Sequence, residues 1–236
     1  MRTLNHGPYR PGRPVSNSER DTRAQLLSAA TDLFAECGVA ATSFALIAKR
    51  AGLTPAMVHY YFKSRDQLID AVVEERLVPF IRFVWDPCAA ADDAPEMIRG
   101  VVRRLLSGIQ REPWVPSTWM REILNERGLL RTKALRRLPL DKLRLVGEAI
   151  RAGQARHTLN PDLDPLLAVF SALGLVMLHM ATAKVWAEIF HRRALPHETL
   201  HRHITSLFLD GLCHPARSSP ENFSNKPRPR RNHERS

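Results

Sequence analysis

Apolar side chains recur at intervals of three and four residues along most of this chain, and no segment sustains an alternation of apolar and polar positions. Intervals of three and four place side chains on one face of an α-helix, whereas alternation is typical of strands. The first apolar stripe begins after Ser18 or Asp21, either of which can cap a helix, and it stops at Gly38. The pattern therefore predicts an all-α fold.

Two short helices are predicted next, separated by a tight turn. Thr42 or Ser43 can cap the first, which ends at Gly52, and Thr54 followed by Pro55 begins the second. Glycine permits the positive φ that such a reversal needs, so the arrangement predicts a helix-turn-helix. In that motif the second helix lies in the major groove of DNA.

A fourth, longer helix is predicted from the S-x-x-Q capping box of residues 64–67 through Leu77, with Pro79 and Pro87 bounding or kinking its far end. Further helices are predicted near residues 94–110, 116–126, 133–156, 163–192 and 197–212. We expect a flexible basic arm over 1–20, a helix-turn-helix DNA-binding domain over 21–66, a helical effector-binding and dimerisation domain over 67–213, and a disordered basic tail over 214–236.

Two stretches carry a family resemblance. They are TRAQLLSAATDLFAECG, from Thr22 to Gly38, and ATSFALIAKRAGLTPAMVHYYFKSRDQLIDAVV, from Ala41 to Val73. Together they resemble the TetR/AcrR family of one-component transcriptional regulators. The resemblance implies a homodimer whose N-terminal three-helix heads bind a palindromic operator, and a larger helical C-terminal domain that binds an effector and releases the DNA.

The resemblance also implies which residues meet DNA. Thr42 is placed near phosphate, the start of the recognition helix faces bases, and Lys63 and Arg65 are placed as phosphate ligands. Tyr61 either lies against the DNA backbone or packs within the head, and Phe62 is expected to pack. The full expected set in the head is Thr42, Ser43, Thr54, Pro55, Ala56, Met57, His59, Tyr60, Tyr61, Lys63 and Arg65.

Charge sits mainly at the ends of the chain. The net charge is +11, while the segment from residue 24 to 66 holds four basic and three acidic groups. DNA affinity is largely electrostatic, so the nearly neutral head needs help from the basic arm. There, Arg10 and Arg13 lie in YRPGRP, which resembles a short Gly-Arg-Pro hook for an A·T minor groove; an ordinary disordered tail is the alternative.

The larger domain is expected to hold a neutral or anionic hydrophobic effector and to dimerise through the helices near 163–192 and 197–212. Large adaptable side chains are suited to such a ligand, although any one of them could be ordinary core. Arg121 and Glu122 either contact the effector or lie on a solvated helix face. The candidate effector residues are Phe83, Trp85, Met97, Trp114, Trp119, Met120, Met177, His179, Met180 and Trp186.

Other classes of protein have weaker support. The uncharged run of 165–183 just reaches the length of a membrane span, although a core helix facing a dimer partner explains it without a membrane. Basic tails alone could make a non-specific nucleic-acid binder. His197 and His201 have metal-ligand spacing without a completing ligand, and no nucleophile or phosphate-loop motif is present. We therefore expect a cytoplasmic DNA-binding regulator, most simply a repressor, with no enzymatic activity, cofactor, metal or membrane.

Overall fold

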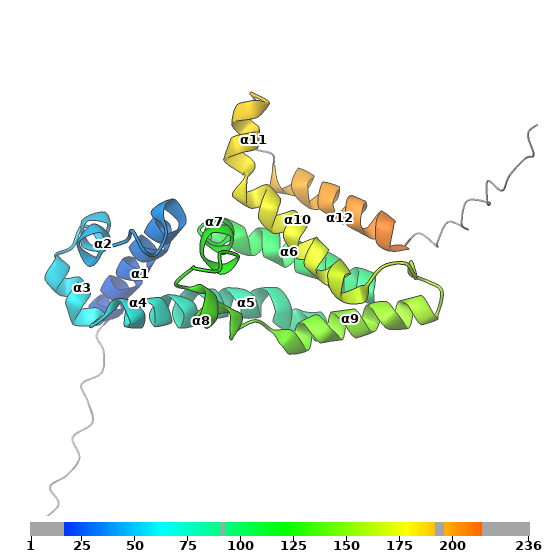
Figure 1. The fold of residues 1–236 in the computed structure, drawn as a ribbon, viewed down its shortest axis with the longest axis horizontal. Coiled ribbons are helices and arrows are strands. Elements are labelled where there is room, and N and C mark those ends of the chain that lie inside the picture. The colour runs from blue at the N-terminus through cyan, green and yellow to red at the C-terminus, as the bar shows by residue number, and fades with distance from the viewer. Residues whose placement is uncertain (1–16, 91–92, 192–195, 214–236) are drawn as a thin grey trace, which may run out of the picture.

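A computed structural model of the protein describes residues 17–90, 93–191 and 196–213. Those residues form helices and contain no strand, which confirms the predicted all-α fold. Figure 1 shows an elongated molecule with the first three helices at one end and the remaining helices at the other. The expected arm and tail, with Arg10 and Arg13, lie outside the described residues.

The head consists of α1 (Asn17–Cys37), α2 (Phe44–Ala51) and α3 (Pro55–Tyr61), followed by the start of α4 (Arg65–Val72). Gly38 and Gly52 end α1 and α2 with φ of 84° and 66°, the left-handed conformation that glycine adopts without strain. The N-cap of α2 is Ser43, whose hydroxyl accepts from the Leu46 N–H, and not Thr42. Thr54 precedes α3 as predicted, but its hydroxyl makes no capping bond.

The predicted fourth helix continues further than expected and changes its winding. After α4 come a π-helical turn, η1 (Val73–Leu77), the helix α5 (Val78–Trp85) and a 3₁₀ turn, η2 (Asp86–Ala90). Pro79 has no N–H to donate to the preceding turn and its ring crowds that turn, so a wider π turn before it keeps the helix going. The continuous run from α4 to α5 joins the head to the rest of the molecule (Figure 1).

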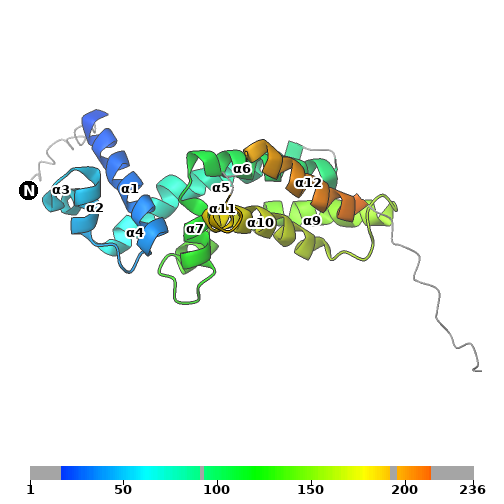
Figure 2. The same ribbon diagram turned by 90° about the horizontal axis from the view of Figure 1, so that it is seen from above.

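The larger domain surrounds α6 (Ala94–Arg111), which packs against α5, α9 (Leu140–Ala155), α10 (Pro165–Ala181) and α12 (His197–Cys213). Figure 2 shows these helices side by side from above. The predicted helix near 116–126 is a short α7 (Val115–Thr118) followed by a π turn, η3 (Trp119–Ile123).

Two predicted long helices are divided. The segment 133–156 forms α8 (Arg131–Leu135) and α9, because Pro139 cannot continue a helix from the residues before it. The segment 163–192 breaks at Thr182 into α10 and α11 (Ala183–Ile189), which differ in direction by 58°. α11 stands away from the body in Figure 1 and is seen along its axis in Figure 2.

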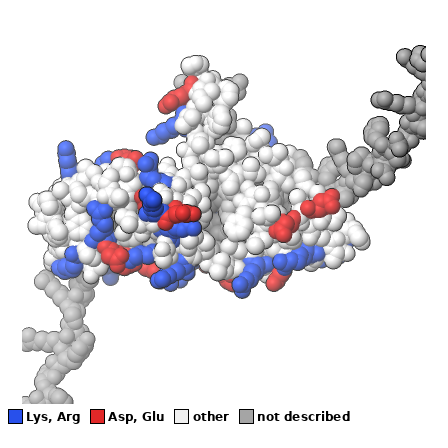
Figure 3. Space-filling view, in the orientation of Figure 1, with Lys and Arg blue, Asp and Glu red and all other residues white. Residues whose placement is uncertain are grey.

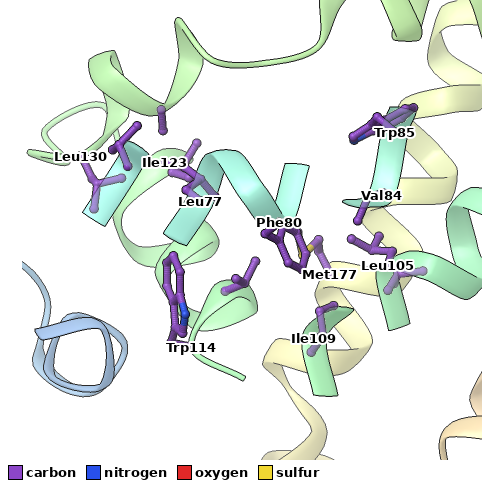
Figure 4. Close-up of a cluster of buried hydrophobic side chains, with 14 of the residues drawn as sticks. Leu77, Phe80, Val84, Trp85, Leu105, Ile109, Trp114, Ile123, Leu130 and Met177 are labelled. Atoms are coloured by element: carbon purple, nitrogen blue, oxygen red, sulfur yellow. The ribbon is translucent and has the colours of Figure 1, made fainter. Parts of the chain in front are cut away.

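One core runs through both parts of the described chain. Figure 4 shows the part of this core in the larger domain, where Met177 of α10 lies beside Phe80 of α5, close to Leu105 and Ile109 of α6. Each fully buried large apolar side chain contributes about 1.5–3 kcal/mol relative to an exposed one. Burial on this scale fixes α5 against α6 and α10.

Within the described ranges, no single helix is long and apolar enough to cross a membrane. Taken together, α10 and α11 have the length and composition of a membrane span, but they are bent by 58° at the break between them.

Candidate nucleic-acid interface

The recognition helix α3 is anchored by one face and open on the other. Val58 and Phe62 are fully buried in the head, which fixes the roll of a helix only seven residues long. The opposite face carries exposed His59 and Tyr60, with Tyr60 64% exposed. Thr54, Pro55 and Ala56 are also exposed, whereas Met57 and Tyr61 are half-buried. The predicted base-reading residues therefore share one accessible end of the molecule.

Ring contacts orient the side chains on this face. The His59 ring meets the edge of Phe44 on α2 with centroids 4.9 Å apart, and Tyr60 meets Tyr61 at 5.1 Å. The Lys63 ammonium lies 5.7 Å from the centre of the Tyr60 ring, a cation–π distance. An aromatic face with a cation at its end is suited to a phosphate backbone and the adjacent base edges.

The structure separates the two residues expected at the start of α2. Ser43 is exposed and caps α2, so it lies where a phosphate can approach. Thr42 is only 3% exposed, and its hydroxyl donates to the Gly38 carbonyl at 2.8 Å. The Thr42 side chain therefore stabilises the loop between α1 and α2 and is not presented to DNA.

Arg65 was expected at a phosphate, and its guanidinium is engaged within the protein. It donates to the carbonyls of Val39, Ala40 and Thr42 at 3.0–3.1 Å. These bonds hold the α1–α2 loop against the start of α4. Sequence reasoning missed this role because the three acceptors are backbone atoms more than twenty positions away.

Several charges on the head are paired. Arg50 forms a fork with Glu36, with one contact of 2.6 Å, and this hydrogen bond lowers the pKa of the Glu36 carboxyl. Arg23 pairs with Glu75. Figure 3 shows acidic and basic side chains interspersed over the head on this face. The expectation that the arm supplies additional attraction to DNA stays a prediction, because the arm lies outside the described residues.

A carboxylate from the larger domain reaches the head. Glu122 on η3 is 6% exposed, and its Oε1 accepts from the Val39 N–H at 2.8 Å. Its other oxygen accepts from the Leu129 N–H at 3.1 Å. Neither sequence-based alternative for Glu122, an effector contact or a solvated face, describes this position.

The candidate effector residues do not line a common cavity. Trp85, Met97, Trp114 and Met177 are buried in the core, and three of them appear in Figure 4. Trp119, His179 and Met180 are half-buried, while Phe83, Met120 and Trp186 are exposed. A cavity of about 210 Å³ lies elsewhere, between the start of α6 and the end of α9, and none of the candidates lines it: its lining is Asp93, Ala94, Pro95, Ala149, Gly153, Arg156, Thr158 and Leu159.

The expected dimerisation helices carry apolar side chains that stay exposed among the described residues. Figure 3 shows few charged side chains over α10 and α12. Exposed apolar residues on α10, α11 and α12 are Leu166, Leu167, Phe170, Leu178, Val185, Trp186, Ile189 and Leu207. Exposed apolar side chains that gather into a patch are typical of a protein–protein interface. Among the described side chains, no three that could ligate a metal are grouped together, His197 and His201 included.

Comparison with known proteins agrees with this geometry. Residues 26–72 match the family described as bacterial regulatory proteins, tetR family. An HTH-type transcriptional repressor of Mycobacterium tuberculosis is 40% identical over 67 residues, which are 28% of this chain and 36% of that protein. The HTH-type transcriptional regulator BetI of Burkholderia thailandensis is 33% identical over 103 residues, 42% of this chain and 51% of that protein.

Solved structures extend the similarity in fold to the larger domain. The ketosteroid transcriptional regulator KstR2 of Mycobacterium tuberculosis has a TM-score of 0.66 at 18% identity, over 81% of this chain and 95% of that one. FadR of Bacillus subtilis, solved in complex with stearoyl-CoA, has a TM-score of 0.59 at 20% identity, over 80% of this chain and 98% of that one. The N-terminal part is thus a helix-turn-helix DNA-binding domain. It is this part of the chain, residues 26–72, that matches the tetR family.

Proposed function

We propose that this protein is a dimeric transcriptional repressor that binds a palindromic operator and is released from it by a small hydrophobic effector. The observation that carries the proposal is the outward face of α3, held by buried Val58 and Phe62 at the tip of a TetR-type head. The curated relatives are named as transcriptional regulators, and the chain spans between 36% and 51% of the length of those compared here.

Each head reads one half-site. α3 enters the major groove, where Met57 and Ala56 touch apolar base edges and His59 hydrogen-bonds to a base. Lys63, Tyr60 and Ser43 contact the phosphates on either side. Arg10 and Arg13 of the arm extend into the neighbouring minor groove and supply the charge that the head lacks.

Two copies associate through α10 and α12. Leu167, Phe170 and Leu207 are between 49% and 65% exposed in one chain, and a two-fold axis brings the same apolar surface of a second copy against them. Four antiparallel helices packed in this way bury the surface of an otherwise unusually apolar α10. The two-fold symmetry of the dimer then matches the symmetry of a palindromic operator.

The effector acts on the helices between head and dimer interface. The apolar interior around Phe80, Trp114 and Met177 favours a neutral or anionic hydrophobic molecule. An effector that binds better when the heads are misplaced shifts the population away from the DNA-bound form. A coupling of about 1–3 kcal/mol is sufficient. The protein acts in the cytoplasm, where its DNA is.

The test is selection of bound duplexes from a random DNA pool at near-physiological salt, with the full-length chain. A Met57→Ala, Tyr60→Ala double variant is selected in parallel, and Leu140→Ala, which removes an exposed apolar side chain of α9, is the matched control. We expect an enriched palindrome for the wild type and the control and none for the double variant. A pool retained without any motif, equally by all three proteins, would show that the basic tails bind charge alone and would overturn the proposal.

A further inference from the structure

Glu122 joins two distant parts of the chain through both of its carboxylate oxygens. Oε1 accepts from the N–H of Val39, in the loop between α1 and α2 of the head, and Oε2 accepts from the N–H of Leu129. With 6% exposure, it is one of four polar or charged residues that are buried in the described chain and the only charged one of these. Burying a carboxylate is costly unless it is hydrogen-bonded, so both N–H bonds are needed to keep it there.

The head loop that Glu122 holds is also held from α4. The Val39 N–H points to Glu122 while the Val39 carbonyl accepts from Arg65 at 3.1 Å. Gly38 precedes it with φ of 84°, and a Cβ at this position would lie 3.0 Å from Glu122 Oε1. One residue of the head, Val39, is thus held by the larger domain through its N–H and by the linking helix through its carbonyl.

The segment that carries Glu122 belongs to the larger domain. It is the π turn η3, and the loop after it folds back so closely that a Cβ on Gly128 would lie 1.8 Å from the Glu122 carbonyl oxygen. π turns inside helices frequently mark functional positions, because they shift the side chains that follow by a fraction of a turn. Trp119 and Met120, two candidate effector residues, lie in the same five-residue turn.

We propose that Glu122 is a positioning residue for operator binding, through which the larger domain sets the angle of each head. The proposal rests on the proposed function above and adds the contact by which it is regulated. A displacement of η3 moves the carboxylate, and with it the Val39 peptide and the loop that orients α2 and α3. With this bond in place, the two heads of a dimer keep a fixed separation and match a single half-site spacing.

Glu122→Gln is the informative variant, because glutamine has the same shape but only one acceptor oxygen. Whichever way its amide turns, either Val39 or Leu129 faces an NH₂ group and loses its acceptor. Glu126→Gln is the matched control, since Glu126 is exposed in the following loop. If Glu122→Gln does not fold, Glu122→Asp, which retains the negative charge on a shorter side chain, is used for the same measurements.

Two measurements test the proposal with full-length protein. The first is hydrogen–deuterium exchange of the peptide that contains Val39, which needs no DNA; we expect faster exchange in Glu122→Gln and no change in Glu126→Gln. The second compares the selected operator with one that carries a single inserted base pair between half-sites. We expect the wild type to discriminate about tenfold and Glu122→Gln about threefold or less, with little change in melting temperature.

The outcomes separate the two proposals. Unchanged exchange at the head loop overturns the role of Glu122, whatever the DNA result. Faster exchange with unchanged spacing discrimination also overturns it, because the bond then stabilises a loop without positioning the head. A wild type with no operator preference overturns the proposed function instead, and the exchange measurement still decides whether Glu122 holds the head loop.

Discussion

The Arg76 guanidinium donates to the Ser28 hydroxyl at 2.7 Å, which joins η1 to the first helix of the head. The same nitrogen donates to the Ala24 carbonyl at 2.9 Å. Its other terminal nitrogen lies 3.7 Å from Glu112, at the end of α6. Glu112 in turn accepts from the Trp114 indole N–H at 2.6 Å. Arg76 therefore connects the head to the larger domain from the middle of the linking helix.

We expect Arg76→Ala to lower the free energy of unfolding by about 1–2 kcal/mol, because two hydrogen bonds across the junction are lost. Urea denaturation followed by circular dichroism measures the change. Arg82→Ala is the control, since Arg82 is exposed on α5, and it should change stability by less than about 0.5 kcal/mol. Equal effects of the two substitutions would mean that Arg76 contributes only as a surface charge.

Two glycines of the larger domain should respond to alanine in opposite directions. A Cβ at Gly128 would lie 1.8 Å from a backbone oxygen of Glu122, so Gly128→Ala should lower stability by about 3 kcal/mol through forced displacement of the loop. Gly147 lies within α9 with nothing within 4 Å of an added Cβ, so Gly147→Ala should raise stability by up to about 1 kcal/mol. Thermal and urea unfolding of both variants give the comparison. A stable Gly128→Ala protein would contradict the close contact with η3.

Cys37 and Cys88 should differ in their reaction with iodoacetamide. Cys37 is exposed, whereas Cys88 has no exposed surface, and burial raises the pKa of its thiol above the ordinary value. A raised pKa leaves less reactive thiolate at pH 8, so both access and ionisation slow Cys88. We expect alkylation of Cys37 to be at least about tenfold faster, as followed by mass spectrometry of the tryptic peptides. In urea the alkylation rates of Cys37 and Cys88 should converge. If they still differ in urea, burial of Cys88 is not the cause of the difference between the two rates.

The head could be predicted from the sequence almost element by element, because its signals are local. The stripe that ends at Gly38, the turn at Gly52 and the S-x-x-Q box at Ser64 each set a helix boundary by bonds within a few residues. The two breaks in the larger domain were missed for different reasons. The break before α9 has a local signal, Pro139, that the apolar stripe obscured, whereas nothing in the sequence around Thr182 indicates a bend of 58°.

The candidate site likewise has a part that could be predicted from the sequence and a part that could not. The exposed face of α3 follows from helical spacing around Val58 and Phe62, and the structure places its residues together. The hydrogen bonds of Thr42, Arg65 and Glu122 within the protein were missed because their partners are backbone atoms, for Arg65 and Glu122 distant in the sequence. Glu122 binds an N–H 83 positions away, and no pattern in the sequence of η3 distinguishes it from a solvated glutamate. Buried polar groups of this kind are found through their hydrogen bonds in the folded chain.

The apolar surface of α10 provides a test of dimerisation. Leu167 is 65% exposed, and Leu167→Glu places two like charges near each other across a two-fold axis. We expect the dimer to dissociate at least about tenfold more readily, seen by light scattering as a shift toward the 26.8 kDa monomer. Leu140→Glu, on the exposed side of α9, controls for the added charge. If both variants elute as the wild type does, α10 does not form the interface.

Lys63 and His59 should affect DNA binding in different ways. Lys63 lies beside Tyr60 at the end of α3 and is placed to neutralise a phosphate, which carries no sequence information. His59 is fixed against Phe44 with its other edge exposed, so it can distinguish bases.

We therefore expect Lys63→Gln to weaken binding to all duplexes alike and to reduce the slope of log affinity against log salt by about 1. His59→Ala should keep the slope and relax the preference at one base position per half-site, at a cost of about 1–3 kcal/mol. Both are measured by fluorescence anisotropy with the selected operator and single-base variants at three salt concentrations. If His59→Ala changes the slope and Lys63→Gln changes the base preference, α3 lies in the groove with the opposite roll about its axis, and the assignment of its faces has to be reversed.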